Sequence, residues 1–334
     1  VGAVAFGPGA FIAIAERGEM GVRIHGPGGE RLRVIGRDGQ GPGEFGALNG
    51  LGFRADSMFV FDSRWFRISF FDPEGEYVRQ VVPESAFGDR PRWHAFAPAA
   101  GLLTTSRGAD ANLVWGLHGF DGRPIQSFAR APSMAAPTLT MLTPSGGNAG
   151  PSEPLRLFTA QPIAGPWRDR VVVTAGAEYR LQFHDASGSV TEVWSVADAL
   201  PRRVTSEDVE AARERAIENT RPDLRSTLDR RWSNVDPAER FPAFGVGAGM
   251  AFLAAPQMIE SPEGELWVMG YPTDFAPDRG PRWWVFRADG TLLGSVDFPP
   301  RFELHAVSEA GALGILEDEY DVQRVAMYSL LRPD

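Results

Sequence analysis

Residues 56–75 read DSMFVFDSRWFRISFFDPEG, which is two short apolar runs separated by a polar turn. Residues 58–61 alternate between two faces with the period of a β-strand. The second run ends at Asp72, just before Gly75, and glycine adopts at little cost the positive φ that a tight hairpin requires. The stretch therefore predicts short antiparallel strands joined by tight turns.

Both runs recur along the chain. The first recurs six times, as a turn followed by a short apolar segment, at residues 11–14, 58–61, 102–103, 171–173, 266–268 and 313–315. The second recurs five times, as a segment that ends in an aromatic residue or histidine before Gly29, Gly75, Gly122, Gly188 or Gly290. Gly29 and Gly75 are 46 residues apart, and both Gly75 to Gly122 and Gly264 to Gly311 span 47.

A period of this length with two hairpins in each repeat is typical of a four-stranded propeller blade. The sequence therefore predicts an all-β fold, a six-bladed β-propeller of four-stranded antiparallel blades. A β-sandwich of similar strand count is the alternative, but a sandwich does not require a constant period. The expected single domain, residues 1–334, has blades at about 1–46, 47–88, 89–130, 155–200, 245–300 and 301–334.

Two segments interrupt the repeat. Residues 131–154 are rich in Pro, Ser, Gly and Ala and are expected to form a loop. Residues 201–244 are expected to form an insertion whose segment 204–232 is helical, because Thr205 and Asp208 resemble a capping box. The sixth repeat lacks its last strand. Since propellers usually close by pairing the two chain ends, we expect a missing strand to precede Val1.

Composition excludes several classes of protein. The chain has 334 residues, a net charge of −10 and no cysteine, so disulfides, Cys-bound zinc and Cys-ligated clusters are ruled out. All 33 basic residues are arginine, which rules out a P-loop or Schiff-base lysine. The acidic balance disfavours a nucleic-acid partner. No apolar run is long enough for a transmembrane helix, and no signal peptide is present in the sequence.

One segment resembles a known family. Residues 34–45, VIGRDGQGPGEF, resemble the "iGr.G.GPGEF" segment of bacterial six-bladed β-propeller proteins related to the NHL-repeat group. Residues 59–72 and 324–328 resemble the strand pair and the last strand of that family. Its members are mostly exported and uncharacterised, so the resemblance implies the fold and an extracytoplasmic location, periplasmic or at the cell surface. It implies no catalytic residues and no cofactor.

The candidate ligand site is the mouth of the central channel. The residues that the repeat places at strand ends or on channel-lining first strands are Asp62, Arg64, His94, His305 and Glu317. Asp62 is also expected to form an ion pair with Arg67 that fixes a hairpin, which would leave Arg64 outside. A ring of histidine and carboxylate groups could bind a divalent cation. No local metal-binding motif supports such a site, so no metal and no cofactor is predicted.

Large aromatic residues beside arginine are typical of interface hot spots. The candidates for partner binding are Trp93, Trp232, Trp283 and Trp284, with packing between blades as the alternative role.

The sequence thus favours a non-catalytic binding or scaffold propeller, an accessory subunit of a larger extracytoplasmic or membrane-attached complex with protein partners. The alternative is a propeller enzyme, a lyase or hydrolase, with a metal or ligand site in the channel around His94 and His305.

Overall fold

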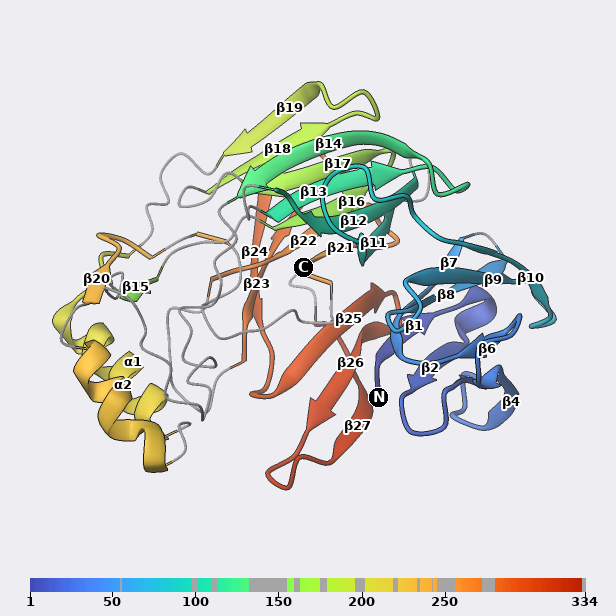
Figure 1. Ribbon diagram of the computed structural model, residues 1–334, viewed down its shortest axis with the longest axis horizontal. Helices are drawn as coiled ribbons and strands as arrows, with labels where there is room; N and C mark the ends of the chain where they lie inside the picture. The colour runs from blue at the N-terminus through green and yellow to red at the C-terminus, as the bar shows by residue number, and fades with distance from the viewer. Residues whose placement is uncertain are drawn as a thin grey trace.

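The computed structural model describes most of the chain: residues 1–54, 56–97, 101–109, 113–131, 155–158, 163–174, 179–195, 202–218, 222–232, 235–241, 243–244, 256–271 and 280–331. Within these residues, six antiparallel sheets follow one another in chain order around a common centre (Figure 1). The predicted six-bladed β-propeller is therefore confirmed.

Five blades have four strands, joined as a simple meander. Blade 1 contains β1 (Ala3–Phe6), β2 (Ile12–Glu16), β3 (Gly21–His25) and β4 (Arg31–Ile35). Blade 2 contains β7 (Leu48–Arg54), β8 (Ser57–Asp62), β9 (Arg67–Phe71) and β10 (Tyr77–Val81). Blade 3 contains β11 (Arg92–Ala97), β12 (Gly101–Arg107), β13 (Leu113–His118) and β14 (Pro124–Ala131). Blade 4 contains β16 (Ala164–Trp167), β17 (Arg170–Thr174), β18 (Arg180–His184) and β19 (Val190–Ser195). Blade 5 contains β21 (Met258–Glu260), β22 (Leu266–Met269), β23 (Arg282–Phe286) and β24 (Leu292–Asp297).

Blade 6 has three strands among the described residues: β25 (Phe302–Ser308), β26 (Gly311–Glu317) and β27 (Gln323–Tyr328). The first strands of neighbouring blades contact one another around the whole ring, in the order β1, β7, β11, β16, β21, β25 and back to β1. The six sheets therefore form a closed ring, and their first strands surround its centre.

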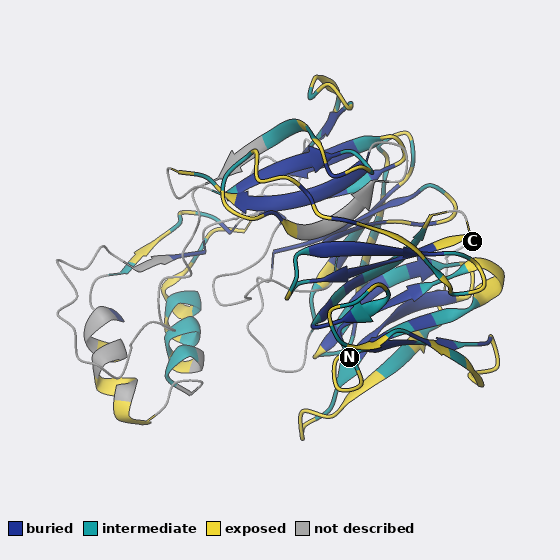
Figure 2. Ribbon diagram, turned by 45° about the vertical axis from the view of Figure 1, so that its right-hand side comes forward, coloured by how far each residue is buried: buried dark blue, intermediate teal, exposed yellow. Residues whose placement is uncertain are grey.

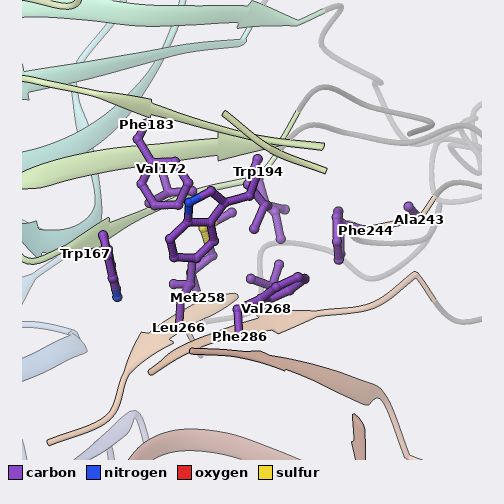
Figure 3. Close-up of a cluster of buried hydrophobic side chains, with 12 residues drawn as sticks. Trp167, Val172, Phe183, Trp194, Ala243, Phe244, Met258, Leu266, Val268 and Phe286 are labelled. Atoms are coloured by element: carbon purple, nitrogen blue, oxygen red, sulfur yellow. The ribbon is translucent and has the colours of Figure 1, made fainter. Parts of the chain in front are cut away.

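The core consists of apolar clusters, each lying between two adjacent blades. The largest joins blades 4 and 5, where Trp167, Phe183 and Trp194 pack against Phe286 and Val268 (Figure 3). Because both faces of a blade meet a neighbour, the second and third strands of blades 2 to 5 are mostly buried (Figure 2). This explains why the first and second apolar runs of each repeat are so rich in aromatic and β-branched residues.

A helical insertion leaves the ring between blades 4 and 5. It contains α1 (Ser206–Glu218), the short 3₁₀ helix η2 (Pro222–Leu224) and α2 (Arg225–Trp232), which lie beside the disc rather than within it (Figures 1 and 2). The predicted cap is confirmed: Thr205 Oγ1 accepts the N–H of Asp208, and an Asp208 oxygen accepts the Thr205 N–H at 2.7 Å. Among the described residues, no helix is both long and apolar enough to cross a bilayer.

Four short strands lie outside the blades. β5 (Arg37–Asp38) and β6 (Glu44–Phe45) pair in parallel within the connection between blades 1 and 2. β15 (Leu155–Leu157) lies in the range expected for blade 4, but it pairs in parallel with β20 (Val235–Pro237) of the insertion. The 131–154 loop lies outside the described residues.

Candidate functional site

Antiparallel order places the candidate residues on one face of the disc. In each blade, successive strands run in opposite directions. The turn between the second and third strands therefore lies at the same end of the sheet as the connection to the next blade. Asp62, Arg64 and Glu317 lie at such turns, and the helical insertion is such a connection. These groups and the beginnings of the first strands therefore share one face, which we call the connection face.

Asp62 ends β8 and is fully buried. Its two carboxylate oxygens accept the backbone N–H groups of Gly46, Ala47, Arg64 and Trp65 at 2.8–3.3 Å. The guanidinium of Arg67 lies 3.8 Å away, so the predicted ion pair is confirmed. This carboxylate holds the entry to β7 and the β8–β9 turn together, and its oxygens are occupied by these contacts.

Arg67 connects this turn to the 34–45 segment. Its guanidinium donates to the backbone carbonyls of Gln40 at 2.9 Å and Glu44 at 2.6 Å. Glu44 accepts the N–H of Gly41 at 2.8 Å and pairs with Arg37, and these two contacts lower the pKa of its carboxyl. The acidic side chain of Glu44 is thus bound within its own segment, which forms the connection between blades 1 and 2.

Arg64 points outward from the β8–β9 turn. The residue is exposed, and its guanidinium lies 5.3 Å from the ring centroid of the half-buried Trp65. Its backbone N–H donates to Asp62, and its side chain passes beside Gly46, where an added Cβ would lie 2.7 Å from the Arg64 Cδ. The sequence predicted that Arg67 pairs with Asp62 and that Arg64 stays outside this ion pair, and both parts of the prediction are confirmed.

His94 and His305 occupy equivalent positions in opposite blades. Each is the extra residue of a β-bulge in a first strand, between Trp93 and Ala95 in β11 and between Leu304 and Ala306 in β25. In both strands three paired positions separate the bulge from the hairpin. Bulges re-aim a side chain and are frequent beside functional sites. A similar bulge at Asn49 in β7, which the sequence reasoning missed, places its amide oxygen as acceptor for the Ser63 hydroxyl.

The His305 side chain is almost fully buried. Among the described residues its Nε2 has no hydrogen-bond partner, and a carboxylate oxygen of Glu303 lies 3.9 Å away. The His94 side chain lies outside the described part of the structure. The two bulges therefore lie at the same distance from their hairpins in the channel wall, and of the two histidines only His305 has a described side chain.

Glu317 is the last residue of β26, and its carboxylate lies beside Arg301 and Gln323. Arg301 lies 3.6 Å from it, and Gln323 donates to its carboxylate at 3.3 Å. In the following turn, Asp318 accepts the N–H groups of Val322 and Tyr320, and the first of these contacts is the main cause of the lowered pKa of Asp318. The acidic run is therefore a turn neutralised in part by arginine. His305 and Glu317 share no hydrogen bond or ion pair with Asp62.

The candidate tryptophans lie largely inside the protein. Trp283 is 1% exposed and belongs to the cluster between blades 5 and 6, and Trp284 packs beside the cluster between blades 4 and 5. Trp232 is 9% exposed and anchors the helical insertion. Nothing is described of the Trp93 side chain. The described members of this set therefore contribute to packing, and the accessible part of the insertion consists of other residues.

The remaining histidines close hairpins or fill the core. His25 and His184 each contact, through Nδ1, the backbone carbonyl of the glycine four residues later, at 3.0 and 3.1 Å, as their equivalent positions in the repeat suggested. His118 is buried, and its Nε2 contacts the Glu84 carbonyl at 2.9 Å. Across the described chain, no group of three or more His, Asp or Glu side chains is arranged to bind a metal ion.

Comparison with known proteins gives no family assignment for the chain. No protein-family model matches the chain, and no curated protein matches it in sequence. Membership of the GPGEF-containing group therefore stays a prediction. Among solved structures, a Bacteroides fragilis protein described as exported matches with a TM-score of 0.46 and 11% identity, over 95% of this chain and 79% of that one.

Two further structures are similar at the same level. Virginiamycin B lyase of Staphylococcus aureus has a TM-score of 0.43 and 10% identity, over 98% of this chain and 84% of the lyase. A Bacteroides caccae protein of unknown function has a TM-score of 0.43 and 10% identity, over 89% and 81%. Such distant likeness transfers neither an activity nor a site.

Proposed function

We propose that this propeller is a non-catalytic binding module, an accessory subunit of a larger extracytoplasmic or membrane-attached assembly. The observation that carries the proposal is the helical insertion, which extends from the connection face beside the disc (Figure 2). A scaffold needs an element that reaches beyond its own core, and this insertion is such an element.

The insertion is firmly attached to the propeller. Phe158, Trp232, Phe241 and Tyr271 form a small buried cluster beneath α1, and Tyr271 follows the blade 5 strand β22. The Tyr271 N–H donates to the Ala243 carbonyl at 3.2 Å, which joins the insertion to that blade. The helices therefore have a defined position, so that a partner would meet a preorganised surface.

The exposed face of α1 is acidic. Glu207, Glu210 and Glu214 are exposed and follow the i, i+3, i+7 spacing of one helix face. The opposite face packs Val209, Ala212 and other small residues onto the cluster. A partner with a basic docking surface would be attracted to this face, and salt would weaken the attraction.

Native electrophoresis of extracts from the source cells tests the proposal. The wild-type protein should migrate with a larger assembly, and the triple variant Glu207→Arg, Glu210→Arg and Glu214→Arg should migrate alone. The matched control reverses three exposed carboxylates elsewhere, at Glu74, Glu309 and Glu319. A wild-type protein that migrates as a lone monomer in every fraction would refute the proposal.

The extracytoplasmic location is part of the same proposal. It rests on the resemblance of residues 34–45 to a mostly exported group. Fractionation of source cells should recover the protein outside the cytoplasmic fraction, and recovery with cytoplasmic markers would contradict that placement.

A channel enzyme is the second candidate, favoured by one observation: the buried His305 Nε2 has no partner in the described part of the chain and lies on a bulge in the channel wall. Metal analysis of the purified protein separates the two candidates. Stoichiometric, tightly bound transition metal that is lost in His305→Gln would favour the enzyme over the binding module.

A further inference from the structure

Two exposed arginines mark a basic surface where blade 2 meets blade 3. Arg64 lies in the β8–β9 turn, and Arg90 lies in the connection that follows β10. Neither guanidinium forms a salt bridge within the described chain. The connection is held against blade 3 because Asp89 accepts the Arg107 N–H at 2.7 Å and donates to the Arg107 carbonyl at 2.9 Å. In a chain with a net charge of −10, such unpaired positive groups are unusual.

Each of these arginines lies over an aromatic ring. The Arg90 guanidinium is 5.6 Å from the ring centroid of Phe66, and that of Arg64 is 5.3 Å from the ring centroid of Trp65. Both rings are half-buried, so part of each is accessible. Arginine and large aromatic residues together are the composition of interface hot spots. We call Arg64, Trp65, Phe66 and Arg90 the arginine–aromatic patch.

The patch and the helical insertion belong to the same face of the disc. The β8–β9 turn and the connection after β10 lie on the connection face, and the insertion is itself a connection on that face. In Figure 1, blade 2 lies on the right of the ring, and α1 and α2 lie on the left. The connection face therefore carries a basic surface on one side and an acidic helix on the other.

We propose that the arginine–aromatic patch binds the acidic face of α1 from a second copy of this chain. The inference rests on the proposed function, since it takes α1 as the docking helix, and it names the partner. Glu210 already pairs with Arg213, but Glu207 and Glu214 form no salt bridge with any described residue. Their carboxylates are the complement of the two unpaired guanidinium groups.

A two-fold axis in the plane of the connection face satisfies both copies at once. Such an axis turns one disc over and exchanges its left and right sides. The α1 helix of each copy then lies over the patch of the other, so the same contact occurs twice and the assembly closes as a dimer. An unrelated acidic protein would occupy the patch of one copy and leave its α1 uninvolved.

The mass of the purified protein in solution is the first test. Sedimentation equilibrium should give twice the mass of one chain at moderate salt. At about 1 M salt, where charges are screened beyond about 3 Å, the dissociation constant should rise at least about tenfold. A purified protein that stays monomeric up to its solubility limit would overturn the inference. If that monomer still joins a larger assembly in cell extracts, the proposed function survives without it.

Charge reversal on each side of the contact is the second test. The variant Arg64→Glu with Arg90→Glu should dimerise at least about tenfold more weakly than wild type, because its patch repels α1. The matched control reverses two exposed arginines at hairpins of the opposite face, Arg31→Glu with Arg287→Glu, and should dimerise as wild type does. Equal behaviour of the two variants would refute docking at the patch.

Mixing variants tests the pairing itself. The patch variant and the α1 variant (Glu207→Arg, Glu210→Arg and Glu214→Arg) should each be monomeric alone. An equimolar mixture should form dimers, because one contact is then wild type and the other has both charges reversed. This rescue requires that both variants are folded, so a loss of structure cannot imitate it. A mixture that stays monomeric, or that grows into longer chains, would contradict the two-fold arrangement.

Discussion

Asp62 is a fully buried carboxylate that is stabilised mainly by backbone N–H groups and only secondarily by an arginine. Four N–H donors saturate its oxygens, and Arg67 contributes at 3.8 Å while also bonding three backbone carbonyls. The pairing was predictable because the two residues face each other across a hairpin. The N–H donors were not, since Gly46 and Ala47 arrive from the preceding connection.

Replacing this carboxylate should be costly. Asp62→Asn puts an amide NH₂ against backbone donors and leaves Arg67 without its charge partner, so we expect a loss of about 3 kcal/mol in the free energy of unfolding. Urea denaturation measures the change. Asp56→Asn, in the exposed β7–β8 turn, is the control and should stay within about 0.5 kcal/mol of wild type. Equal effects would mean that Asp62 is not a structural centre.

His118 should make stability depend on pH. Its ring is buried, and burial lowers the pKa of the imidazole from its ordinary value of 6.5. The Glu84 carbonyl can only accept, so Nε2 carries the proton and Nδ1 accepts the Thr104 hydroxyl at 3.2 Å. The folded state therefore binds fewer protons than the unfolded state, and stability should fall as pH drops below about 6.5.

The comparison for this prediction is His118→Gln. Unfolding free energies of both proteins between pH 7.5 and 5.5 should differ in slope, with the wild type losing more stability on acidification. Identical slopes would show that His118 is not the group responsible.

At the scale of elements, the connection formed by residues 34–45 depends on its glycines. Several of them have a positive φ or lie so close to neighbouring atoms that a larger residue would not fit. Gly36 has φ = 78°, and a Cβ placed there would lie 2.2 Å from the Phe45 ring. The segment is thus fixed by its packing between blades 1 and 2.

Gly36→Ala, compared with Gly9→Ala, separates the cost of a left-handed backbone from the cost of a steric clash. We expect a cost of about 1–2 kcal/mol for the left-handed backbone and a further 1–3 kcal/mol or so for the clash with Phe45. Gly9→Ala is a close control, because Gly9 has φ = 68° but open space around its Cβ, so only the backbone term applies. Thermal and urea unfolding measure both, and equal losses would exclude the clash.

The helical insertion could be predicted from the sequence only in part. The Thr205–Asp208 cap was readable because capping is local in sequence. Its Asp208 also receives both terminal nitrogens of Arg202, and these contacts lower the pKa of Asp208 to about 2. The parallel pairing of β15 with β20 was not readable, since its two strands lie far apart in the chain and no repeat relates them.

At the scale of the whole molecule, the six seams between blades differ in how many apolar side chains they bury. Among the described residues, five seams receive an apolar side chain from an outer strand, and the seam between blades 6 and 1 receives none. Apolar area buried between blades is the main stabilising contribution in such a ring. The seam between blades 6 and 1 should therefore be the place where the propeller opens.

Exchange mass spectrometry tests this expectation. Amides of β1, β26 and β27 should exchange before those of β17, β18 and β22, which border the large cluster between blades 4 and 5. Leu313→Ala should accelerate exchange in blades 6 and 1 selectively, whereas Leu266→Ala should loosen blades 4 and 5. Uniform exchange around the ring would contradict the assignment of a weak seam.

By itself, the sequence determined the number of blades and their strand order. These follow from periodicity, and every repeat contains its own local signal in alternating apolar runs and hairpin glycines. Only the tertiary structure decided what each candidate side chain does. Burial and hydrogen-bond partners depend on residues brought together from different repeats, which is why Asp62 supports the fold from inside and Trp283 is a core residue.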